Sequence, residues 1–310
     1  MAIVLIVLLV VVTLVGGTIL AGHFAFSITP KPSKQTPRDL GLNHRDVYFQ
    51  NRHGTVLHGW WIPSDDASRD NPLPTVVMIH GWSRNCQRML PYIRAIQSLP
   101  LNILVFEGRG HGENAKESFI SQVGIADDIN AAVDWLVLRP EVQLEKIGVI
   151  GHSLGAAATI LETSRDKRIS AFVADGSYAN PLEVILGMMK EAHVPYIPFG
   201  WLMKHYIQLR LNTTFHKVAP QTVISKITVP GLLIHGDKDT VVPVEDSQRN
   251  LEHAPENIQL WIAEGCGHSD TYTHPEFATI LRTFLKNALL NRPVAFFHGQ
   301  SSGSVISDLN

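Results

Sequence analysis

Short apolar runs alternate with longer helical patterns through most of the chain, and this alternation restricts the fold more than any other feature. The predicted strands are Val47–Phe49, Val56–Ile62, Thr75–Ile79, Ile103–Phe106, Ile147–Ile150, Ala171–Ala174, Gly231–Ile234 and Ile258–Ile262. The predicted helices are Cys86–Ser98, Val123–Leu138, Leu154–Thr163, Val244–Leu251 and Pro275–Leu289. This order is typical of an α/β fold with a mostly parallel central sheet and helices on both faces. The first two strands are predicted to form an antiparallel hairpin.

The composition excludes several classes of protein. Of the 310 residues, 45 % are hydrophobic and 17 % are charged, with 26 Lys+Arg against 28 Asp+Glu. This balance argues against a nucleic-acid-binding protein, which needs a basic excess. Cys86 and Cys266 are far apart, and there is no CxxC or HExxH pattern. The sequence therefore predicts neither a metal nor a cofactor.

An uncharged apolar segment, Ala2–Gly22, lies at the N-terminus. As a helix it would be about 30 Å long, the thickness of the hydrocarbon core of a bilayer. Residues 1–28 are therefore predicted to be a transmembrane anchor. The alternative is a signal peptide, but such a peptide carries Lys or Arg ahead of a shorter apolar core. Lys31, Lys34 and Arg38 follow the segment, which favours a cytoplasmic position for the rest of the chain. Secretion after cleavage is the alternative location.

Three further divisions of the chain follow from composition. Residues 29–42 contain three prolines and little apolar material, and they are predicted to be a tether. Residues 43–290 are predicted to be the globular domain, and residues 291–310 a C-terminal tail.

The sequence Gly151-His152-Ser153-Leu154-Gly155 follows one predicted strand and begins a predicted helix. A GxSxG pattern in this context places the serine hydroxyl on a sharp turn above the sheet. The two glycines are needed because side chains there would collide as strand and helix approach each other. Ser153 is therefore the candidate nucleophile.

Candidate partners for Ser153 follow the last two predicted strands. A serine hydroxyl needs a histidine to take its proton, and a carboxylate to orient that histidine. His268 is the candidate base and Asp239 the candidate acid, while Asp237 and Asp270 remain alternatives. All three loops follow parallel strands, so they meet at one edge of the sheet.

An oxyanion formed at Ser153 would need two backbone donors. The N–H of Leu154 is one candidate, and the N–H of Trp82, in the loop after an earlier strand, is the other. His80 is predicted to pack the adjacent turn. The Gly-rich segment around Arg109 is predicted to be a compact loop in which Arg109 holds loop carboxylates or carbonyl groups.

In these motifs the sequence resembles the α/β-hydrolase superfamily over roughly residues 43–290, and most closely its Bem46-like and S9/S33-peptidase-like branches. The matching segments, in family order, are HGWS (80–83), EGRGHGEN (107–114), GHSLG (151–155), HGDKDTVVP (235–243) and GCGHSD (265–270). The family spacing within the fourth segment favours Asp239 over Asp237. One departure is Glu107, where relatives commonly have Asp, and it is expected to affect loop packing only.

The resemblance also implies a short helical cap over Ser153, at about residues 177–225. This segment is rich in methionine and aromatic residues. Met188 and Trp201 are predicted to line an apolar substrate pocket. Two alternatives are that these side chains only pack the cap onto the domain, or that they enter the bilayer beside the anchor.

From the apolar N-terminal segment and the hydrolase motifs together, we expect a membrane-anchored serine hydrolase similar to carboxylesterases or lipases. Its expected substrates are small-molecule or lipid esters, including thioesters. An aminopeptidase-like or acyl-peptide hydrolase is the first alternative, and a non-catalytic binding protein of the same fold is a distant one. The natural substrate and the oligomeric state do not follow from the sequence.

Overall fold

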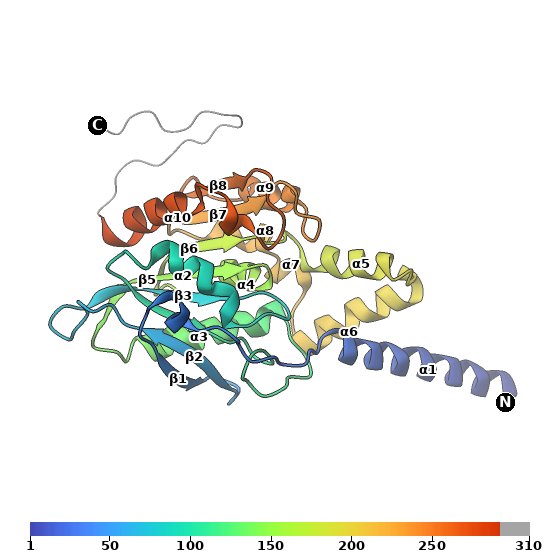
Figure 1. The fold of residues 1–310 in the computed structure, drawn as a ribbon. Coiled ribbons are helices and arrows are strands. Elements are labelled where there is room, and N and C mark those ends of the chain that lie inside the picture. Colours follow the sequence, from blue (N-terminus) through green and yellow to red (C-terminus); the bar gives the residue numbers. More distant parts are fainter. Residues whose placement is uncertain (292–310) are drawn as a thin grey trace.

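The computed structural model describes residues 1–291, so the predicted tail, 291–310, lies outside the described residues apart from Asn291. One eight-stranded sheet has the order β1-β2-β4-β3-β5-β6-β7-β8 (Figure 1). The strands are β1 (Arg45–Gln50), β2 (Val56–Ile62), β3 (Leu73–Ile79), β4 (Asn102–Phe106), β5 (Val142–His152), β6 (Ile169–Asp175), β7 (Gly231–Gly236) and β8 (Ile258–Ala263). β2 is antiparallel to β1 and β4, and every other pairing is parallel. The predicted fold class and the hairpin are confirmed.

The helices that the structure describes lie on both faces of this sheet and in segments that project from the domain (Figure 1). They are α1 (Ala2–Ala25), α2 (Leu90–Ile96), α3 (Gln122–Leu136), α4 (Leu154–Thr163), α5 (Pro181–Glu191), α6 (Trp201–Leu211), α7 (Phe215–Val218), α8 (Pro220–Val223), α9 (Val244–Glu252) and α10 (Phe277–Leu285). Along β3, Val77 belongs to the core under α3 and α4, while Val76 and Met78 belong to the core under α2 and α10. Successive side chains of a strand point to opposite faces, so a strand covered on both sides must be apolar throughout.

One predicted helix begins later than expected. Residues Cys86–Met89 form a 3₁₀ turn, and α2 starts only at Leu90. Pro91 lies in the first turn of α2, where the missing N–H of proline costs no hydrogen bond. Placed further inside one continuous helix, the same proline would remove a bond and clash with the preceding turn.

The N-terminal helix α1 is long and apolar enough to cross a membrane, with a mean hydropathy of 3.1 over its best window. A signal sequence passes the same test, so α1 is a candidate for either. Its C-terminal part lies against α6, where a Cβ atom on Gly22 would be 2.8 Å from the Tyr206 ring. α1 projects from the domain on the same side as α5 and α6 (Figure 1).

The segment predicted to be a tether lies along the domain. The backbone N–H groups of Lys34 and Gln35 donate to Oε1 of Gln87, at 2.9 and 3.2 Å, and Nδ2 of Asn85 donates to the carbonyl of Lys31 at 3.0 Å. A 3₁₀ turn, Pro37–Leu40, follows. These contacts hold residues 31–40 against the loop that precedes α2.

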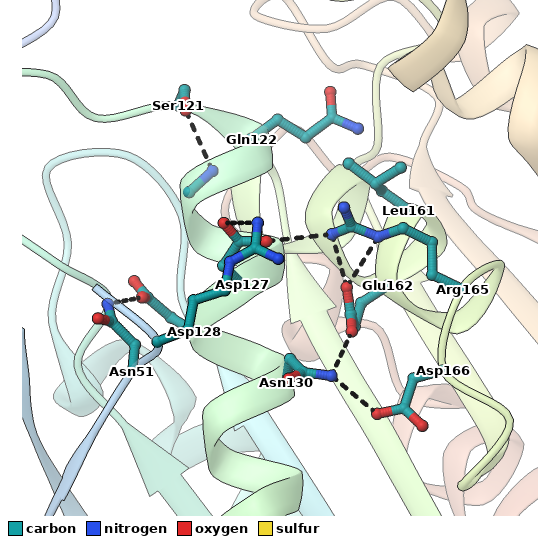
Figure 2. Close-up of polar contacts among 12 residues, drawn as sticks. Asn51, Ser121, Gln122, Asp127, Asp128, Asn130, Leu161, Glu162, Arg165 and Asp166 are labelled. Carbon is teal, nitrogen blue, oxygen red and sulfur yellow. Dashed lines mark hydrogen bonds and ion pairs between the residues drawn. The ribbon is translucent and has the colours of Figure 1, made fainter. Parts of the chain in front are cut away.

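A polar network joins α3 to α4 on one side of the sheet. Asn130 on α3 donates to Glu162 at 2.9 Å and to Asp166 at 3.1 Å, and Arg165 donates to Glu162 at 2.6 Å. Figure 2 shows these contacts, together with the link from Arg165 to Asp127. The network fixes the position of α4, and therefore of the turn from which α4 begins.

A second part of this network holds the glycine-rich loop that follows β4. Nη2 of Arg109 lies 2.7 Å from Oδ1 of Asp128, whose side chain is fully buried. Nδ2 of Asn51 donates to the same oxygen at 2.8 Å (Figure 2). A buried ion pair with additional hydrogen bonds satisfies both charges. Arg109 holds its loop as the sequence predicts, but its partner is a carboxylate of helix α3 and not of a loop.

The helices α5 and α6 form a hairpin that projects from the domain (Figure 1). Met203 and Ile207 on α6 pack against Phe119 and Phe215, whereas α5 has no buried residue. The exposed apolar side chains of this segment, called here the hairpin patch, are Met188, Val194, Tyr196, Ile197, Phe199, Trp201 and Leu209. The hairpin lies within residues 177–225, the segment predicted to be a cap.

Candidate active site

Ser153 occupies a strained turn between β5 and α4. Its φ of 55° and ψ of −118° lie in a region that residues other than glycine rarely adopt. The backbone N–H of Ser153 donates to the carbonyl of Asp175 at 2.8 Å, so the neighbouring strand β6 helps to hold the turn. The turn lifts the hydroxyl to the carboxyl edge of the sheet.

The two glycines of the GxSxG sequence are required by close contacts. A Cβ atom on Gly151 would lie 2.2 Å from the carbonyl oxygen of Gly155, and one on Gly155 would lie 2.5 Å from the carbonyl oxygen of His80. Both positions are occupied by backbone atoms that cannot move aside. Any larger residue would push α4 away from the strand and displace Ser153.

Two hydrogen bonds connect Ser153, His268 and Asp239, which the sequence singles out. Nε2 of His268 lies 2.9 Å from Oγ of Ser153, and Nδ1 of His268 lies 2.7 Å from Oδ2 of Asp239. The three residues come from the turns that follow β5, β8 and β7. Their side chains form one continuous chain from hydroxyl to carboxylate.

The carboxylate of Asp239 is buried and fully bonded. Its Oδ1 accepts the backbone N–H groups of Val241 and Val242, each at 2.8 Å, and its Oδ2 faces His268 and His235. Burial acts to raise the pKa of Asp239, but the hydrogen bonds from His235 and His268 outweigh burial and hold this pKa below its usual value. Asp239 is therefore ionised at neutral pH.

The two alternative acids do not contact His268. Oδ1 of Asp237 accepts the backbone N–H of Gly265 at 2.6 Å, and Oδ1 of Asp270 accepts that of Gly267 at 2.6 Å. Both carboxylates bond to the loop after β8. Of the three candidate acids, the structure brings only Asp239 to the histidine.

The turn after β3 lies beside Ser153. A Cβ atom on Gly81 would be 2.9 Å from Cβ of Ser153, which places the next residue, Trp82, at the edge of the site. Leu154 begins α4 directly after the serine. In the turns, loops and helix caps of residues 1–291, the backbone N–H groups of Trp82 and Leu154 donate to no backbone carbonyl.

His80 and Glu107 join two of the loops behind this turn. Nε2 of the buried His80 lies 3.1 Å from Oε2 of Glu107, and Oε1 of Glu107 accepts the N–H of Cys86 at 3.0 Å. These contacts agree with the loop-packing roles that the sequence predicts for both residues.

The sequence analysis assigned no role to three residues that lie at the site: His152, Asp175 and His235. His152 has a fully buried ring whose Nε2 lies 2.8 Å from the carbonyl oxygen of His268, and burial lowers its pKa well below the usual value. Asp175, at the end of β6, accepts the Tyr92 hydroxyl at 2.5 Å and the Thr271 hydroxyl at 2.6 Å.

His235 is the third missed residue. Its Nε2 lies 3.2 Å from Oδ2 of Asp239, and its Nδ1 lies 2.6 Å from the Ser247 hydroxyl. Burial acts to lower the pKa of His235, but the hydrogen bonds to Asp239 and to the carbonyl of Val242, together with the negative charges of Asp239 and Asp175, raise this pKa above its usual value. The only sequence signal for His152 and His235 was their place inside the quoted motifs.

The predicted pocket residues lie apart from this group. Met188 on α5 is 60 % exposed, and Trp201 on α6 is 49 % exposed, with its ring tilted against that of His205. Among the described residues, neither side chain makes a hydrogen bond or aromatic contact with Ser153, His268 or Asp239.

No group of three or more His, Cys, Asp or Glu side chains within residues 1–291 is arranged to hold a metal ion. The polar groups at Ser153 suit proton transfer and nucleophilic attack. An eight-stranded, mostly parallel sheet with a strained serine turn after β5 defines the class as the α/β-hydrolase fold.

Comparison with protein families gives the same class. The model of the alpha/beta hydrolase family matches residues 76–279, and the chain belongs to this family. It is 27 % identical to protein YfhR of Salmonella typhimurium over 228 residues, 73 % of this chain and 75 % of YfhR. It is 28 % identical to the alpha/beta hydrolase domain-containing protein WAV2 of Arabidopsis thaliana over 212 residues, 67 % of this chain and 66 % of WAV2.

Solved structures of similar fold include two hydrolases. The Pyrococcus furiosus esterase Pf2001 is 28 % identical, with a TM-score of 0.65 over 84 % of this chain and 100 % of the esterase. The Pyrococcus horikoshii acylaminoacyl peptidase is 17 % identical, with a TM-score of 0.66 over 83 % of this chain and 43 % of the peptidase. Fold and neighbours support a hydrolase. The Bem46-like branch stays a prediction.

Proposed function

We propose that the protein is a membrane-anchored serine hydrolase that cleaves carboxylic esters, including thioesters, through Ser153, His268 and Asp239. The observation that carries this proposal is the unbroken pair of hydrogen bonds from Ser153 through His268 to Asp239, at 2.9 and 2.7 Å. A serine, histidine and carboxylate in this order are the parts that nucleophilic acyl transfer requires.

In the proposed reaction, Oγ of Ser153 attacks the carbonyl carbon of the ester while Nε2 of His268 accepts the hydroxyl proton. The backbone N–H groups of Trp82 and Leu154 bind the oxyanion. The intermediate collapses to an acyl-enzyme, and the leaving alcohol or thiol takes the proton from His268. Water then attacks the acyl carbon and gives a proton to Nε2 of His268. His268 returns this proton to Oγ of Ser153 as the bond between Oγ and the acyl carbon breaks, which releases the acid and restores free Ser153.

The ionised Asp239 serves this cycle in two ways. Its bond to Nδ1 keeps the proton of neutral His268 on that nitrogen, so that Nε2 is free to accept from Ser153. Its charge then stabilises the imidazolium form of His268. We propose His235 and His152 as positioning residues: His235 contacts Asp239, and His152 bonds to the backbone of His268.

Esters are proposed in preference to peptides because of sequence similarity. The esterase neighbour is 28 % identical and matched over its whole length, whereas the peptidase neighbour is 17 % identical and shares the fold only. We expect the full-length protein in a nonionic detergent to hydrolyse p-nitrophenyl acetate and butyrate, and to turn over amino-acid p-nitroanilides far more slowly. The opposite ranking would contradict the ester assignment.

Membrane anchoring is proposed for α1, and the hairpin patch supports it. Met203 and Tyr206 of α6 lie against Gly22 of α1, so the second helix of the hairpin packs on the apolar helix. Exposed apolar side chains on a helical element are typical of one that lies in the membrane interface. For Met188 and Trp201, we therefore propose contact with the bilayer in place of the predicted substrate pocket.

We expect the full-length protein to remain in the membrane fraction after extraction with alkaline carbonate. A chain lacking residues 2–25 is expected to be soluble and to retain turnover of small esters, since it keeps Phe26, which packs against Phe119. A full-length product recovered in the soluble or secreted fraction and shortened by about 25 residues would identify α1 as a signal peptide.

A further inference from the structure

A strongly basic hollow of about 910 Å³ opens between the tether, the β3–α2 loop and α10. The cations that line it, called here the basic groove, are Lys31, Lys34, Arg84, Arg88, Arg94 and Arg282. Asp39 is the only carboxylate in its lining, and Oδ2 of Asp39 already accepts the backbone N–H of Thr36 at 2.8 Å.

The cations of the basic groove have no carboxylate partners within residues 1–291. The arginines and lysine that do form ion pairs lie elsewhere: Arg52, Arg109, Arg165, Arg168, Lys238 and Arg249. Like charges gathered in a hollow repel one another and produce a positive potential that attracts anions. The groove therefore favours a ligand with more than one negative charge.

Arg88 adds an observation independent of the charge count. Its guanidinium carbon lies 5.8 Å from the ring centre of Tyr92 and 5.2 Å from that of Tyr272. Its Nε and Nη2 are buried without a hydrogen bond in the described part of the chain. The buried carboxylate of Asp175 is bonded to Tyr92 and Thr271 and forms no ion pair with Arg88 there. The positive charge of Arg88 acts on Asp175, whose pKa it lowers against the opposing effect of burial, but two of its guanidinium nitrogens are left without a hydrogen bond.

Part of the groove lining comes from the two loops that also carry residues of the candidate active site. Ser83 and Arg84, in its lining, directly follow Trp82, and Tyr272 comes four residues after His268. The wall formed by Lys31 and Lys34 is fixed by the hydrogen bonds of the tether to Asn85 and Gln87. On the far wall, α2 and α10 lie side by side, and Nη1 of Arg282 donates to the carbonyl of Ala95 at 3.4 Å (Figure 1).

We propose that the basic groove binds phosphate groups, and that the ester cleaved at Ser153 carries a phosphate-bearing group that extends past Arg84 into it. The second statement rests on the proposed hydrolase function, whereas phosphate binding does not. Guanidinium groups match phosphate oxygens in charge and in planar geometry. The volume exceeds that of a single phosphate and suits a diphosphate or a phosphorylated head group.

The first test is calorimetric titration of the full-length protein in nonionic detergent with inorganic pyrophosphate. The test variant carries Lys34→Gln, Arg84→Gln and Arg94→Gln. The control variant removes the same charge from exposed lysines outside the groove, through Lys116→Gln, Lys167→Gln and Lys226→Gln. We expect wild type and control to bind alike, more weakly as salt is raised, and the test variant to bind at least tenfold more weakly.

Absence of pyrophosphate binding by the wild type, or equal binding by the test variant, would overturn the phosphate site. The Ser153→Ala variant is expected to bind pyrophosphate as the wild type does. Because this variant lacks the proposed nucleophile but keeps the basic groove, its binding of pyrophosphate tests the phosphate site independently of the hydrolase function.

A second test addresses the substrate. Pyrophosphate is expected to raise KM for the ester hydrolysis of dihexanoyl phosphatidic acid, a carboxylic ester that carries a phosphate, without lowering kcat. An unchanged KM for this ester at saturating pyrophosphate would overturn the link to Ser153. Glycerol 3-phosphate and dihexanoyl phosphatidic acid distinguish the sources of the phosphate. Equal affinities would assign the groove to soluble phosphate esters, and tighter binding of the lipid would assign it to phospholipid head groups.

Discussion

The His268→Ala variant is expected to lose ester hydrolysis by on the order of 10⁵- to 10⁶-fold in kcat, because Ser153 then has no group that accepts its proton. Residual turnover above the uncatalysed rate is expected from the backbone donors of Trp82 and Leu154. The measurement is steady-state hydrolysis of p-nitrophenyl acetate by the full-length protein, with circular dichroism to show that the variant is folded.

A matched control for this variant is His274→Ala, another histidine of the same region, whose ring packs on Trp261. It is expected to keep kcat within about threefold of the wild type, since it has no contact with Ser153 in the described residues. A His268→Ala variant that is folded and retains wild-type kcat would show that another residue accepts the proton.

The Asp239→Asn variant is expected to lower kcat by about 10⁴-fold, because an amide at this position favours the wrong tautomer of His268. Nδ1 of His268 would accept from the Asn amide, its proton would move to Nε2, and Ser153 would face a donor in place of an acceptor. The loss of charge would also leave the imidazolium form unstabilised.

Asp237→Asn and Asp270→Asn are the controls for this assignment. Each of these carboxylates accepts a backbone N–H with one oxygen, and an asparagine keeps such an oxygen. Both variants are expected to retain kcat within about threefold of the wild type. A severe loss in either, with little loss in Asp239→Asn, would show that the acid is misassigned.

The sequence was sufficient for the features that depend on local pattern. Strands covered on both faces must be apolar at every position, so β3 and β4 were visible as continuous runs. The turn at Ser153 was predictable because the close approach of β5 and α4, which are neighbours in sequence, requires glycine on either side of the serine. The pairing of His268 with Ser153 followed from topology, since the loops after parallel strands meet at one edge of a sheet.

The parts that the sequence did not specify depend on contacts between distant segments. The positions of the carboxylates after the strands left Asp237 and Asp270 as alternatives to Asp239, and the path of the loop after β7 is what brings Asp239 to His268. Asp175 was missed because its partners, Tyr92 and Thr271, lie 83 and 96 residues away along the chain.

The proline-rich tether is a further feature whose contacts with distant segments could not be predicted from its sequence. A proline-rich stretch with little apolar material has the composition of a free linker, but residues 31–40 hydrogen-bond to the domain. These bonds involve backbone groups and the side chains of Asn85 and Gln87, which no pattern in the tether itself reveals. The basic groove was hidden for the same reason, since its cations come from three separate segments.

The role of Ser153 as nucleophile is tested by labelling the full-length protein with a fluorophosphonate probe, followed by mass spectrometry of the tagged peptide. We expect covalent labelling of the wild type at Ser153, labelling of the Ser225→Ala control, and none of the Ser153→Ala variant. Equal labelling of wild type and Ser153→Ala, or a tag on any other serine, would contradict this role.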